Sequence, residues 1–363
     1  MRNRLEELRR MIDRVDEKIV EAMAERIKLS KMVGVEKKRL GMLMVDEERE
    51  KQVYRNVLRK AAEKGLDPAP VEKVFDTIIS YGKRLQGVFA VSYLGPRGSF
   101  TMEAAEKYFS TMPYALQPCP TIRSVFKNVE EGEADYGVVP VENSLEGSVS
   151  ETLDCLASSS LRIVGEEVLK IALHLASRER RLEDVETVFS NPHALAQARR
   201  FLDKVLPDVK IREVSSTSKA ASMASKTGGG AAVCSEAAAR EYGLRILARS
   251  IQDEQENYTR FLILSRIMAE RFKGAARTML IMVLEHKPGS LYNALGVFAK
   301  QGLNLTRIES RPVKGKPWEY MFLVEFDGAS WDKHVSETLE KLKRRTVELK
   351  ILGSYRPAGR KGF

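Results

Sequence analysis

The sequence predicts a multidomain protein with an all-α domain, an α/β domain and an α+β domain, in that order along the chain. A chain of 363 residues is too long for one compact hydrophobic core. Residues 1–87 show long helical periodicity and no strand signal, whereas residues 88–268 alternate short β-branched runs with helical segments. Residues 275–355 follow the pattern strand, helix, strand, strand, helix, strand. We therefore expect domain boundaries near Gly87 and Gly274.

The composition is that of an ordinary globular protein, with 43% apolar and 30% charged residues. No apolar run approaches membrane-spanning length, and the charged N-terminus lacks the apolar core of a signal peptide. The scattered Cys119, Cys155 and Cys234 argue against a disulfide framework, and the four histidines show no metal-ligand spacing. These features predict a cytoplasmic protein without a metal site.

The net charge of +10 permits a nucleic-acid partner, but its distribution argues against one. In residues 1–87 positive and negative side chains are interleaved, which is typical of a solvated, ion-paired helix face. A small polyanionic substrate needs only a few buried cations, so a modest basic excess also fits such a ligand.

The first predicted helix carries an apolar stripe interrupted by charge. Its members recur every three or four residues: Leu5, Leu8, Ile12, Val15, Ile19, Ala22, Leu29 and Val33. Arg26 fills the gap in this rhythm, and Lys37 follows three turns later on nearly the same line. A lone arginine on such a stripe is commonly a snorkelling rim residue. However, polar residues interrupt the core-facing stripes of all three predicted helices, and buried charges require partners, so we expect a bound anion.

Residues 5–86 resemble the all-helical chorismate mutases. The resemblance rests on Leu8-Arg9, Asp16–Ile19, Ala24–Arg26, Lys37, Asp46, Arg49, Glu50 and Gln86. It implies that Arg26 and Arg49 help bind the two substrate carboxylates. It also implies that Lys37 and Gln86 hydrogen-bond the ether oxygen, that Glu50 accepts from the substrate hydroxyl, and that Asp46 lines the pocket. Such an enzyme needs no metal or cofactor, because it only holds chorismate in its reactive conformer and stabilises charge on the breaking bond.

Two positions qualify this resemblance. Arg9 lies seventeen residues before Arg26, about a quarter-turn off its line, so one straight helix cannot aim both at one ligand. The family solves this by dimerising, which implies that Arg9 enters the partner's site. Gly82 stands where the family often has a small hydroxyl residue.

Polar, turn-forming clusters follow short apolar runs or open helical ones throughout the α/β region. They are Gly95–Thr101, Pro140–Ser144, Asn191–His193 with Gln197, Ser216–Ser218 and Asn257–Leu262. Polar groups at the mouth of a buried strand are how α/β folds present chemistry at a crevice. We therefore expect one anion-binding cleft.

Together these clusters resemble prephenate dehydratase, most specifically through Pro140–Ser144 and Thr259–Leu262. The resemblance implies two α/β lobes around a crevice, as in periplasmic binding proteins. It also implies loss of water and carbon dioxide from prephenate to leave phenylpyruvate, for which the enzyme mainly needs an acid for the departing hydroxyl.

The resemblance assigns Thr259 to that hydroxyl, and a weak acid such as threonine needs help from its neighbours. The matching polar active-site positions are Glu142, Asn143, Ser190 and Gln197. We expect the substrate to be bound by Gly98, Ser99, Thr101, Ser144, Thr217, Ser218, Arg260 and Phe261, with a carboxylate near the Gly98-Ser99 amides. Arg260 is either a substrate clamp or half of a structural ion pair.

In the C-terminal region, Pro288–Tyr292 begins a predicted helix, and Gly302–Thr306 turns into a strand that ends at Glu309–Pro312. Through these motifs residues 275–355 resemble an ACT domain of the phenylalanine-binding kind, with a ferredoxin-like fold. The implied phenylalanine site comprises Gly289, Ser290, Leu291, Asn304, Glu309, Ser310, Arg311 and Pro312. Ser290 and Tyr292 depart from the family's usual Gly-Ala-Leu-Val. The alternative is a plain dimerisation module. Because ACT domains pair side by side, a homodimer or higher homo-oligomer is expected.

The leading prediction is a bifunctional enzyme of L-phenylalanine biosynthesis that converts chorismate to prephenate and prephenate to phenylpyruvate. Phenylalanine is the expected feedback inhibitor, with no nucleic-acid or membrane partner. One alternative is a dehydratase with a non-catalytic helical dimerisation arm, which the joint presence of the mutase-like residues disfavours. Another is a ligand-sensing DNA-binding regulator, which is disfavoured because the cations interrupt an apolar stripe instead of lining an exposed face.

Overall fold

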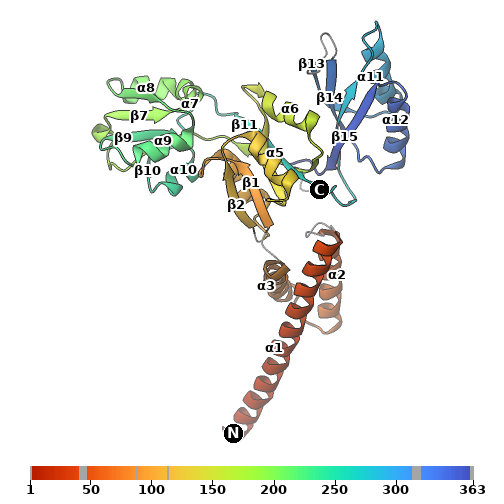
Figure 1. Ribbon diagram of the computed structural model, residues 1–363. Helices are drawn as coiled ribbons and strands as arrows, with labels where there is room; N and C mark the ends of the chain where they lie inside the picture. The colour runs from red at the N-terminus through yellow and green to blue at the C-terminus, as the bar shows by residue number, and fades with distance from the viewer. Residues whose placement is uncertain (1, 41–46, 87–88, 113, 313–319, 360–363) are drawn as a thin grey trace. The chain divides into compact units, whose positions relative to one another are not determined.

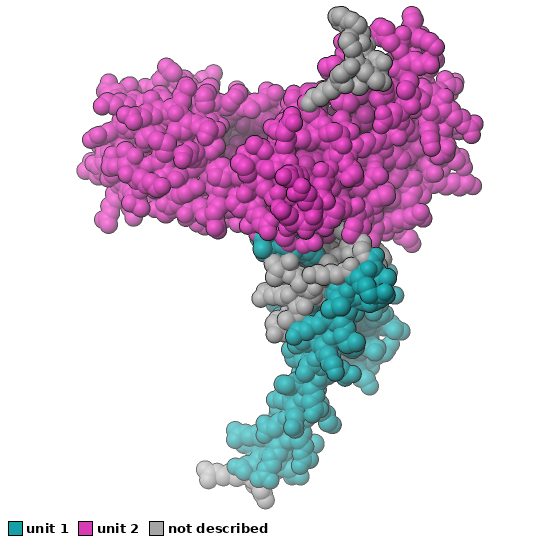
Figure 2. Space-filling view, in the orientation of Figure 1, with its two compact units in different colours: residues 1–89, 109–115 teal, residues 90–108, 116–363 magenta. Residues whose placement is uncertain are grey.

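The structure is a computed structural model that describes residues 2–40, 47–86, 89–112, 114–312 and 320–359 (Figure 1). It contains two compact units, which Figure 2 shows in different colours. One comprises Met1–Phe89 with Phe109–Ala115, and the other comprises Ala90–Tyr108 with Leu116–Phe363. Within the described part of the chain, no helix is long and apolar enough to cross a membrane.

The first unit is built from three helices, α1 (Arg2–Arg39), α2 (Glu47–Glu63) and α3 (Pro68–Gln86). Helix α3 packs against both α1 and α2. It begins with a proline, whose missing N–H is not needed in the first turn, and Asp67 Oδ1 accepts a hydrogen bond from Ala69 N at 3.1 Å. Ala61 and Ile79 are among the buried residues of this bundle.

Helix α1 is about twice as long as its partners, with 38 residues against 17 and 19. Its N-terminal half extends past α2 and α3 in Figure 1. The apolar stripe predicted to face a core is therefore exposed in the single chain: Leu8 is 50% exposed, Ile12 59% and Ile19 52%. This corrects the expectation of a core-facing stripe, because one chain does not supply enough helix to cover it.

The second unit contains three sheets. The first is mixed and has the order β2-β1-β3-β11-β5, with β4 paired to β3. Its strands are β1 (Phe89–Leu94), β2 (Tyr114–Cys119), β3 (Tyr136–Asn143), β4 (Gly147–Ser148), β5 (Arg162–Lys170) and β11 (Tyr258–Ser265). Its helices are α4 (Phe100–Tyr108), α5 (Ile122–Glu131) and α6 (Ser150–Ser158). Strand β11 runs antiparallel between β3 and β5, so a late segment of the chain completes the middle of this sheet.

The second sheet has the order β10-β6-β9-β7-β8 and its own apolar cores. Its strands are β6 (His174–Ser177), β7 (Thr187–Ser190), β8 (Lys210–Glu213), β9 (Gly230–Cys234) and β10 (Arg245–Ala248). The helices are α7 (Pro192–Gln197), α8 (Arg199–Val205), α9 (Thr217–Ala224) and α10 (Glu236–Glu241), with a 3₁₀ turn at Leu182–Asp184. The first sheet and its helices are hereafter the first lobe, and the second sheet and its helices the second lobe.

The third sheet is antiparallel, in the order β13-β14-β12-β15. The elements follow as β12 (Arg277–Val283), α11 (Ser290–Lys300), β13 (Leu305–Pro312), β14 (Tyr320–Asp327), α12 (Lys333–Lys343) and β15 (Glu348–Tyr355). This is the element order that the sequence predicts. Phe298 of α11 packs with Phe326 inside this domain, whereas Met279, Leu352 and Tyr355 belong to the core of the first lobe. Part of the C-terminal sheet thus contributes to the core of the first lobe.

Candidate active sites

A chain of hydrogen bonds lies where β3 ends and β11 begins. Thr259 stands opposite Asn143 in the antiparallel pairing of these strands. Asn143 Nδ2 donates to Thr259 Oγ1 at 2.9 Å and to Asn257 Oδ1 at 2.7 Å. Asn257 Nδ2 in turn donates to Gln197 Oε1, in the second lobe, at 3.1 Å. The structure therefore brings together three of the predicted catalytic residues from distant parts of the chain, through Asn257, which that prediction omitted.

The chemistry of this chain follows from its donors and acceptors. Thr259 Oγ1 accepts from Asn143, so its own hydroxyl hydrogen remains for another acceptor. The hydrogen bond that Thr259 Oγ1 accepts also makes the threonine hydroxyl a better donor, because hydrogen bonds in a series polarise one another. Asn257 is 2% exposed, and its position two residues before Thr259 was the available sequence signal for its role.

The turn after Asn143 is held by reciprocal bonds to the start of β11. Ser144 N donates to Tyr258 O at 2.8 Å, and Tyr258 N donates to Ser144 Oγ at 2.9 Å. Glu146 Oε1 lies 3.2 Å from His193 Nδ1 of α7, so an exposed contact joins this turn to the second lobe. Ser144 is thus placed beside the hydrogen-bond chain, with its hydroxyl already engaged.

The loop after β1 packs against helices of the second lobe. Ser235 Oγ donates to Gly98 O at 3.2 Å, and Ser218 Oγ donates to Arg97 O. Gly98 has φ +75°, and a Cβ there would lie 2.8 Å from Ala238 Cα, so this contact requires glycine. Gly98 N points at Met102 Sδ, 3.3 Å away, rather than into open space.

Other predicted residues hold the scaffold of the two lobes. Ser99 Oγ donates to Leu94 O at 2.9 Å and accepts from Met102 N at 3.3 Å, which orders the start of α4. Ser190 is fully buried, and its hydroxyl donates to Val233 O at 2.7 Å. Thr101 and Thr217 are also buried. These contacts occupy the hydroxyls of Ser99 and Ser190 within the protein.

The opposite face of the same two strands carries charge instead of amides. Arg260 follows Thr259 in β11, and Glu142 precedes Asn143 in β3. Because successive side chains of a strand point to opposite faces, Arg260 and Glu142 lie on the face opposite to Thr259 and Asn143. Arg260 Nη1 lies 3.1 Å from Glu166 Oε2 and 2.7 Å from Glu325 Oε2, and Arg260 Nε lies 2.9 Å from Glu142 Oε1. Arg260, Glu166 and Glu325 are all buried. This geometry favours the structural ion pair over the substrate clamp for Arg260, and it places Glu142 away from Thr259.

The charged cluster joins the first lobe to the C-terminal sheet. Arg277 Nη1 lies 3.0 Å from Glu166 Oε1, and Tyr355 Oη donates to Glu325 Oε2 at 3.2 Å. Burial lowers the pKa of Arg260, but the carboxylates around it, led by Glu325, outweigh burial and raise that pKa overall. Sequence reasoning missed Glu166, Arg277 and Glu325; the available signal was a charge inside an apolar strand. Phe261, a predicted substrate contact, is 1% exposed in the core.

In the helical unit, the structure brings Arg26 to α3. Arg26 Nη1 donates to Ile78 O at 3.3 Å, and burial lowers the pKa of this half-buried side chain. A Cβ on Gly82 would meet Ser30 Oγ at 3.1 Å and Arg26 Nη1 at 3.5 Å, so the glycine lets α3 approach Arg26 closely. This is a packing reason for the departure from the family pattern.

The remaining mutase-like residues are less completely placed. Lys37 is half-buried, and the exposed Arg49 donates to Gln52 Oε1 at 2.8 Å. Arg9 is exposed on α1, about 25 Å along the helix from Arg26. Asp46 and the side chains of Glu50 and Gln86 lie outside the described structure. One chain therefore does not bring Arg9 close to Arg26.

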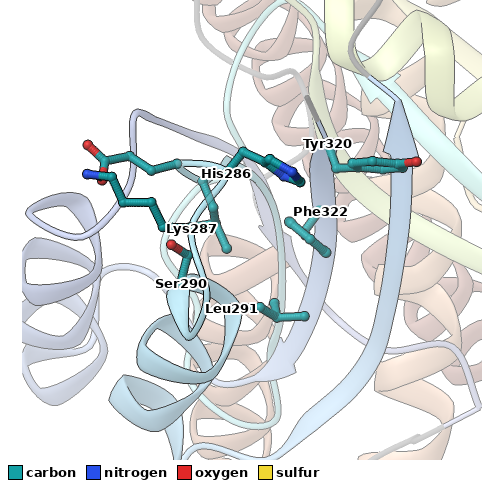
Figure 3. Close-up of a pocket in the computed structure, with 8 residues that line it drawn as sticks. His286, Lys287, Ser290, Leu291, Tyr320 and Phe322 are labelled. Atoms are coloured by element: carbon teal, nitrogen blue, oxygen red, sulfur yellow. The ribbon is translucent and has the colours of Figure 1, made fainter. Parts of the chain in front are cut away.

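A pocket of about 120 Å³ opens in the C-terminal domain (Figure 3). It is lined by Leu284, Glu285, His286, Lys287, Ser290, Leu291, Tyr320 and Phe322. Gly289, with φ +83°, turns the chain into α11 beside it. Ser290 and Leu291 were predicted for the phenylalanine site, whereas His286, Tyr320 and Phe322 were not; the alternation of two aromatic residues along β14 was the available signal.

The other half of the predicted phenylalanine site faces the first lobe. Glu309 Oε2 accepts from Ser148 Oγ at 2.5 Å, and Arg311 Nη2 lies 2.7 Å from Asp154 Oδ1. Ser310 and Pro312 alternate with them and are exposed. Asn304 Nδ2 donates to Asp327 Oδ2 at 3.2 Å. Glu309 and Arg311 therefore do not line the pocket.

Among the described residues, no cluster of three side chains is arranged to hold a metal ion. Three family models match the chain. Chorismate mutase type II matches residues 8–87, prephenate dehydratase residues 91–269, and the ACT domain residues 278–344.

Individual relatives agree with these matches. A bifunctional chorismate mutase/prephenate dehydratase of Aquifex aeolicus is 44% identical over 97% of both chains. The corresponding protein of Pseudomonas aeruginosa is 36% identical over 97% of this chain and 98% of its own. Among solved structures, a prephenate dehydratase from Arthrobacter aurescens in complex with L-Phe is 35% identical, with a TM-score of 0.69, over 76% of this chain and 92% of its own.

Proposed function

The chain belongs to the family of bifunctional chorismate mutase/prephenate dehydratases, and from this premise we propose how its residues divide the two reactions. It converts chorismate to prephenate and prephenate to phenylpyruvate, as an isomerase and a carbon–oxygen lyase of phenylalanine biosynthesis. The family matches favour this bifunctional enzyme over a monofunctional dehydratase with an inert helical arm. We assign the domains to residues 1–87, 88–268 and 275–355.

The hydrogen bond from Asn143 to Thr259 is the observation that carries the dehydratase assignment. As carbon dioxide leaves, the electron pair of its bond to the ring enters the ring, and the ring C–O bond breaks. The hydroxyl takes up a proton and departs as water. Thr259 Oγ–H, made a stronger donor by Asn143, is placed to donate to that leaving oxygen. Gln197 supplies a second amide nearby.

The mutase site of this proposal lies among α1, α2 and α3. Arg26, Lys37 and Arg49 bind the substrate dianion, and Arg9 comes from a second copy of the chain. Support comes from the exposed apolar stripe of α1, which a second copy of the same helix would cover. Ile19→Asp is expected to lower mutase activity while dehydratase activity stays unchanged, because it disrupts only the contact between the α1 helices of two copies. A variant with full mutase activity would contradict this arrangement.

For the C-terminal domain we propose a ferredoxin-like regulatory module that binds phenylalanine and inhibits the dehydratase. The relative of known structure carries L-Phe. The pocket is lined by Leu291, Phe322 and Tyr320, and its volume of about 120 Å³ is close to that of an apolar cavity that holds benzene, roughly 150 Å³. An effector inhibits only if it binds one conformation more tightly than the other.

The pocket assignment has its own test. Leu291→Asp places a charge in the pocket and is expected to leave dehydratase activity intact while removing inhibition by phenylalanine. Unchanged inhibition would mean that phenylalanine acts at the catalytic site as a product-like competitor. Tyr292→Asp, a change at a 79% exposed neighbour outside the pocket lining, is the matched control.

The overall function is tested by supplying the purified chain with chorismate and, separately, with prephenate. Phenylpyruvate is expected from both, at a rate that phenylalanine lowers. Phenylpyruvate from prephenate alone would support the monofunctional alternative. The enzyme is proposed to act in the cytoplasm as a homodimer or larger homo-oligomer.

A further inference from the structure

We propose that Asn257 is a positioning residue of the dehydratase: it fixes the orientation of the Gln197 amide, so that Gln197 presents its N–H₂ group to the substrate. The inference rests on the proposed dehydratase function. It follows from the direction of each hydrogen bond in the chain from Asn143 to Gln197, because amide oxygens only accept and amide nitrogens only donate.

The direction is set at Asn143 by the backbone. Leu145 N and Glu146 N point at Asn143 Oδ1, at 2.9 and 3.1 Å. Backbone N–H groups are donors only, so they require the oxygen of the Asn143 amide on their side. The nitrogen of the same amide must therefore face the other way, where Thr259 Oγ1 and Asn257 Oδ1 lie.

The same reasoning fixes which atoms donate and which accept in the hydrogen bond to Gln197 of the second lobe. Because Asn143 presents a nitrogen, Asn257 must present its oxygen to Asn143, and its nitrogen then faces Gln197. Gln197 must therefore accept with Oε1, which lies 3.1 Å from Asn257 Nδ2. In the described contacts Gln197 Nε2 has no acceptor, so its two hydrogens are left for a ligand. An amide at Gln197 that was turned over would present an acceptor instead.

Asn257 is suited to this task because it is fixed itself. It is 2% exposed, and its backbone carbonyl accepts from Ile171 N at 2.8 Å. The backbone carbonyl of Gln197 accepts from Asp253 N at 2.5 Å, so the segment that leads into β11 also holds the end of α7. The hydrogen-bond chain from Asn143 to Gln197 thus connects the two lobes, and both of its ends are held by backbone contacts. It leaves two donors for the substrate: Thr259 Oγ–H and Gln197 Nε2.

The decisive variant is Asn257→Asp. The introduced carboxylate has nearly the same shape and still accepts from Asn143, so Thr259 remains held. While ionised, it cannot donate to Gln197 Oε1, and Gln197 is expected to turn over and donate Nε2 to it. The donor is thereby withdrawn from the substrate. We expect dehydratase kcat/KM with prephenate to fall about tenfold or more at pH 8.

Acidification provides a readout that a merely structural role would not move. Once protonated, the introduced carboxyl group can again donate to Gln197 Oε1 and restore the original direction. The ratio of variant to wild-type kcat/KM is therefore expected to rise as the pH is lowered from 8 toward 5.5. A deficit that does not change with pH would overturn the proposal, as would wild-type activity at pH 8.

A double-mutant cycle tests whether Asn257 acts through Gln197. Adding Asn257→Asp to a Gln197→Leu protein is expected to change kcat/KM little, because the donor that it controls is already absent. Independent, multiplying losses would overturn the proposal. Gln255→Glu, a change of the same charge at an exposed position of the same segment, is expected to keep wild-type activity. A loss there equal to that of Asn257→Asp would mean that added charge alone explains the effect.

Two internal checks separate this inference from the proposed function. The urea unfolding midpoint of the dehydratase domain, measured for every variant on the same preparation, reports folding and is expected to stay nearly unchanged. Thr259→Ala tests the dehydratase assignment itself. An inactive Thr259→Ala protein together with a fully active Asn257→Asp protein would refute only the positioning role, whereas an active Thr259→Ala protein would refute the site.

Discussion

The two faces of the β3–β11 pair carry opposite kinds of polar chemistry. On one face, neutral amides and a hydroxyl form a directed chain through Asn143 and Thr259. On the other, one residue away along each strand, Glu142 and Arg260 belong to a buried charged cluster shared with the C-terminal domain. We propose catalysis for the neutral face, because the orientation of its amides decides which hydrogen-bond donors remain for a ligand. The charged face is suited to holding domains together because each of its charges requires its partners.

The comparison predicts different consequences for mutations on the two faces. Losing one neutral hydrogen bond costs only about 0.5–1.5 kcal/mol of folding free energy, yet it can remove a catalytic donor. Losing one member of a buried ion pair costs several kcal/mol, because an uncompensated charge is left behind. Variants of the neutral face should therefore lose dehydratase activity with little loss of folding stability. Variants of the charged face should lose folding stability with little direct loss of dehydratase activity.

The largest expected effect is that of Thr259→Ala. Removing the donor for the departing hydroxyl is expected to lower dehydratase kcat by about 10²- to 10⁴-fold. Mutase activity and the urea unfolding midpoint are expected to stay nearly unchanged. Thr259→Ser, which keeps the hydroxyl, is the matched control and should lose far less. A folded Thr259→Ala protein with near-normal turnover of prephenate would remove the assignment.

Next in size is the effect of Glu325→Gln on stability. This change takes one carboxylate from Arg260 and from the Tyr355 hydroxyl in the buried cluster. We expect the free energy of unfolding to fall by about 3 kcal/mol, measured by urea denaturation. Glu337→Gln, on the exposed side of α12, should change it by less than about 0.5 kcal/mol. Equally small changes in unfolding free energy for the two variants would mean that the charged cluster does not stabilise the fold.

A smaller effect separates the neighbours Glu142 and Asn143. Glu142 was predicted to be catalytic, but it lies on the charged face, in contact with Arg260 and Arg307. Its side chain is 37% exposed, so solvent screening limits the expected loss of stability for Glu142→Gln to about 1 kcal/mol. Glu142→Gln should lower dehydratase kcat by less than Asn143→Leu does. If Glu142→Gln proves the more damaging to kcat, the assignment of faces is wrong.

The smallest effect concerns a buried group that is neutral but able to gain charge. Burial lowers the pKa of His174, whose Nδ1 accepts from Ser250 N at 3.0 Å. An unfolded histidine titrates near 6.5, so below that pH the unfolded state binds more protons and stability falls as the pH is lowered. The slope cannot exceed about 1.4 kcal/mol per pH unit. His174→Gln should flatten it between pH 7 and 5, while the exposed control His334→Gln should not.

Much of the fold was predictable because local periodicity encodes it. The helical region, the alternating α/β region and the C-terminal element order follow from spacing within short windows. The prediction of a bifunctional chorismate mutase/prephenate dehydratase is confirmed by the comparisons. The individual site residues stay predictions, and the structure narrows them: it groups Thr259, Asn143 and Gln197 and gives Arg260 a structural environment.

The sequence by itself determined which polar residues lie where apolar runs end or helical segments begin: a threonine before one strand, an asparagine after another apolar run, and a glutamine near an Asn-Pro-His turn. Only the tertiary structure decided which of them meet. Thr259 contacts Asn143 across 116 residues, and Arg260 contacts Glu166 across 94. Strand register sets these pairings, and a shift of one residue would exchange the neutral face for the charged one. Register depends on burial and hydrogen bonding between distant segments, which the periodicity of a single segment does not contain.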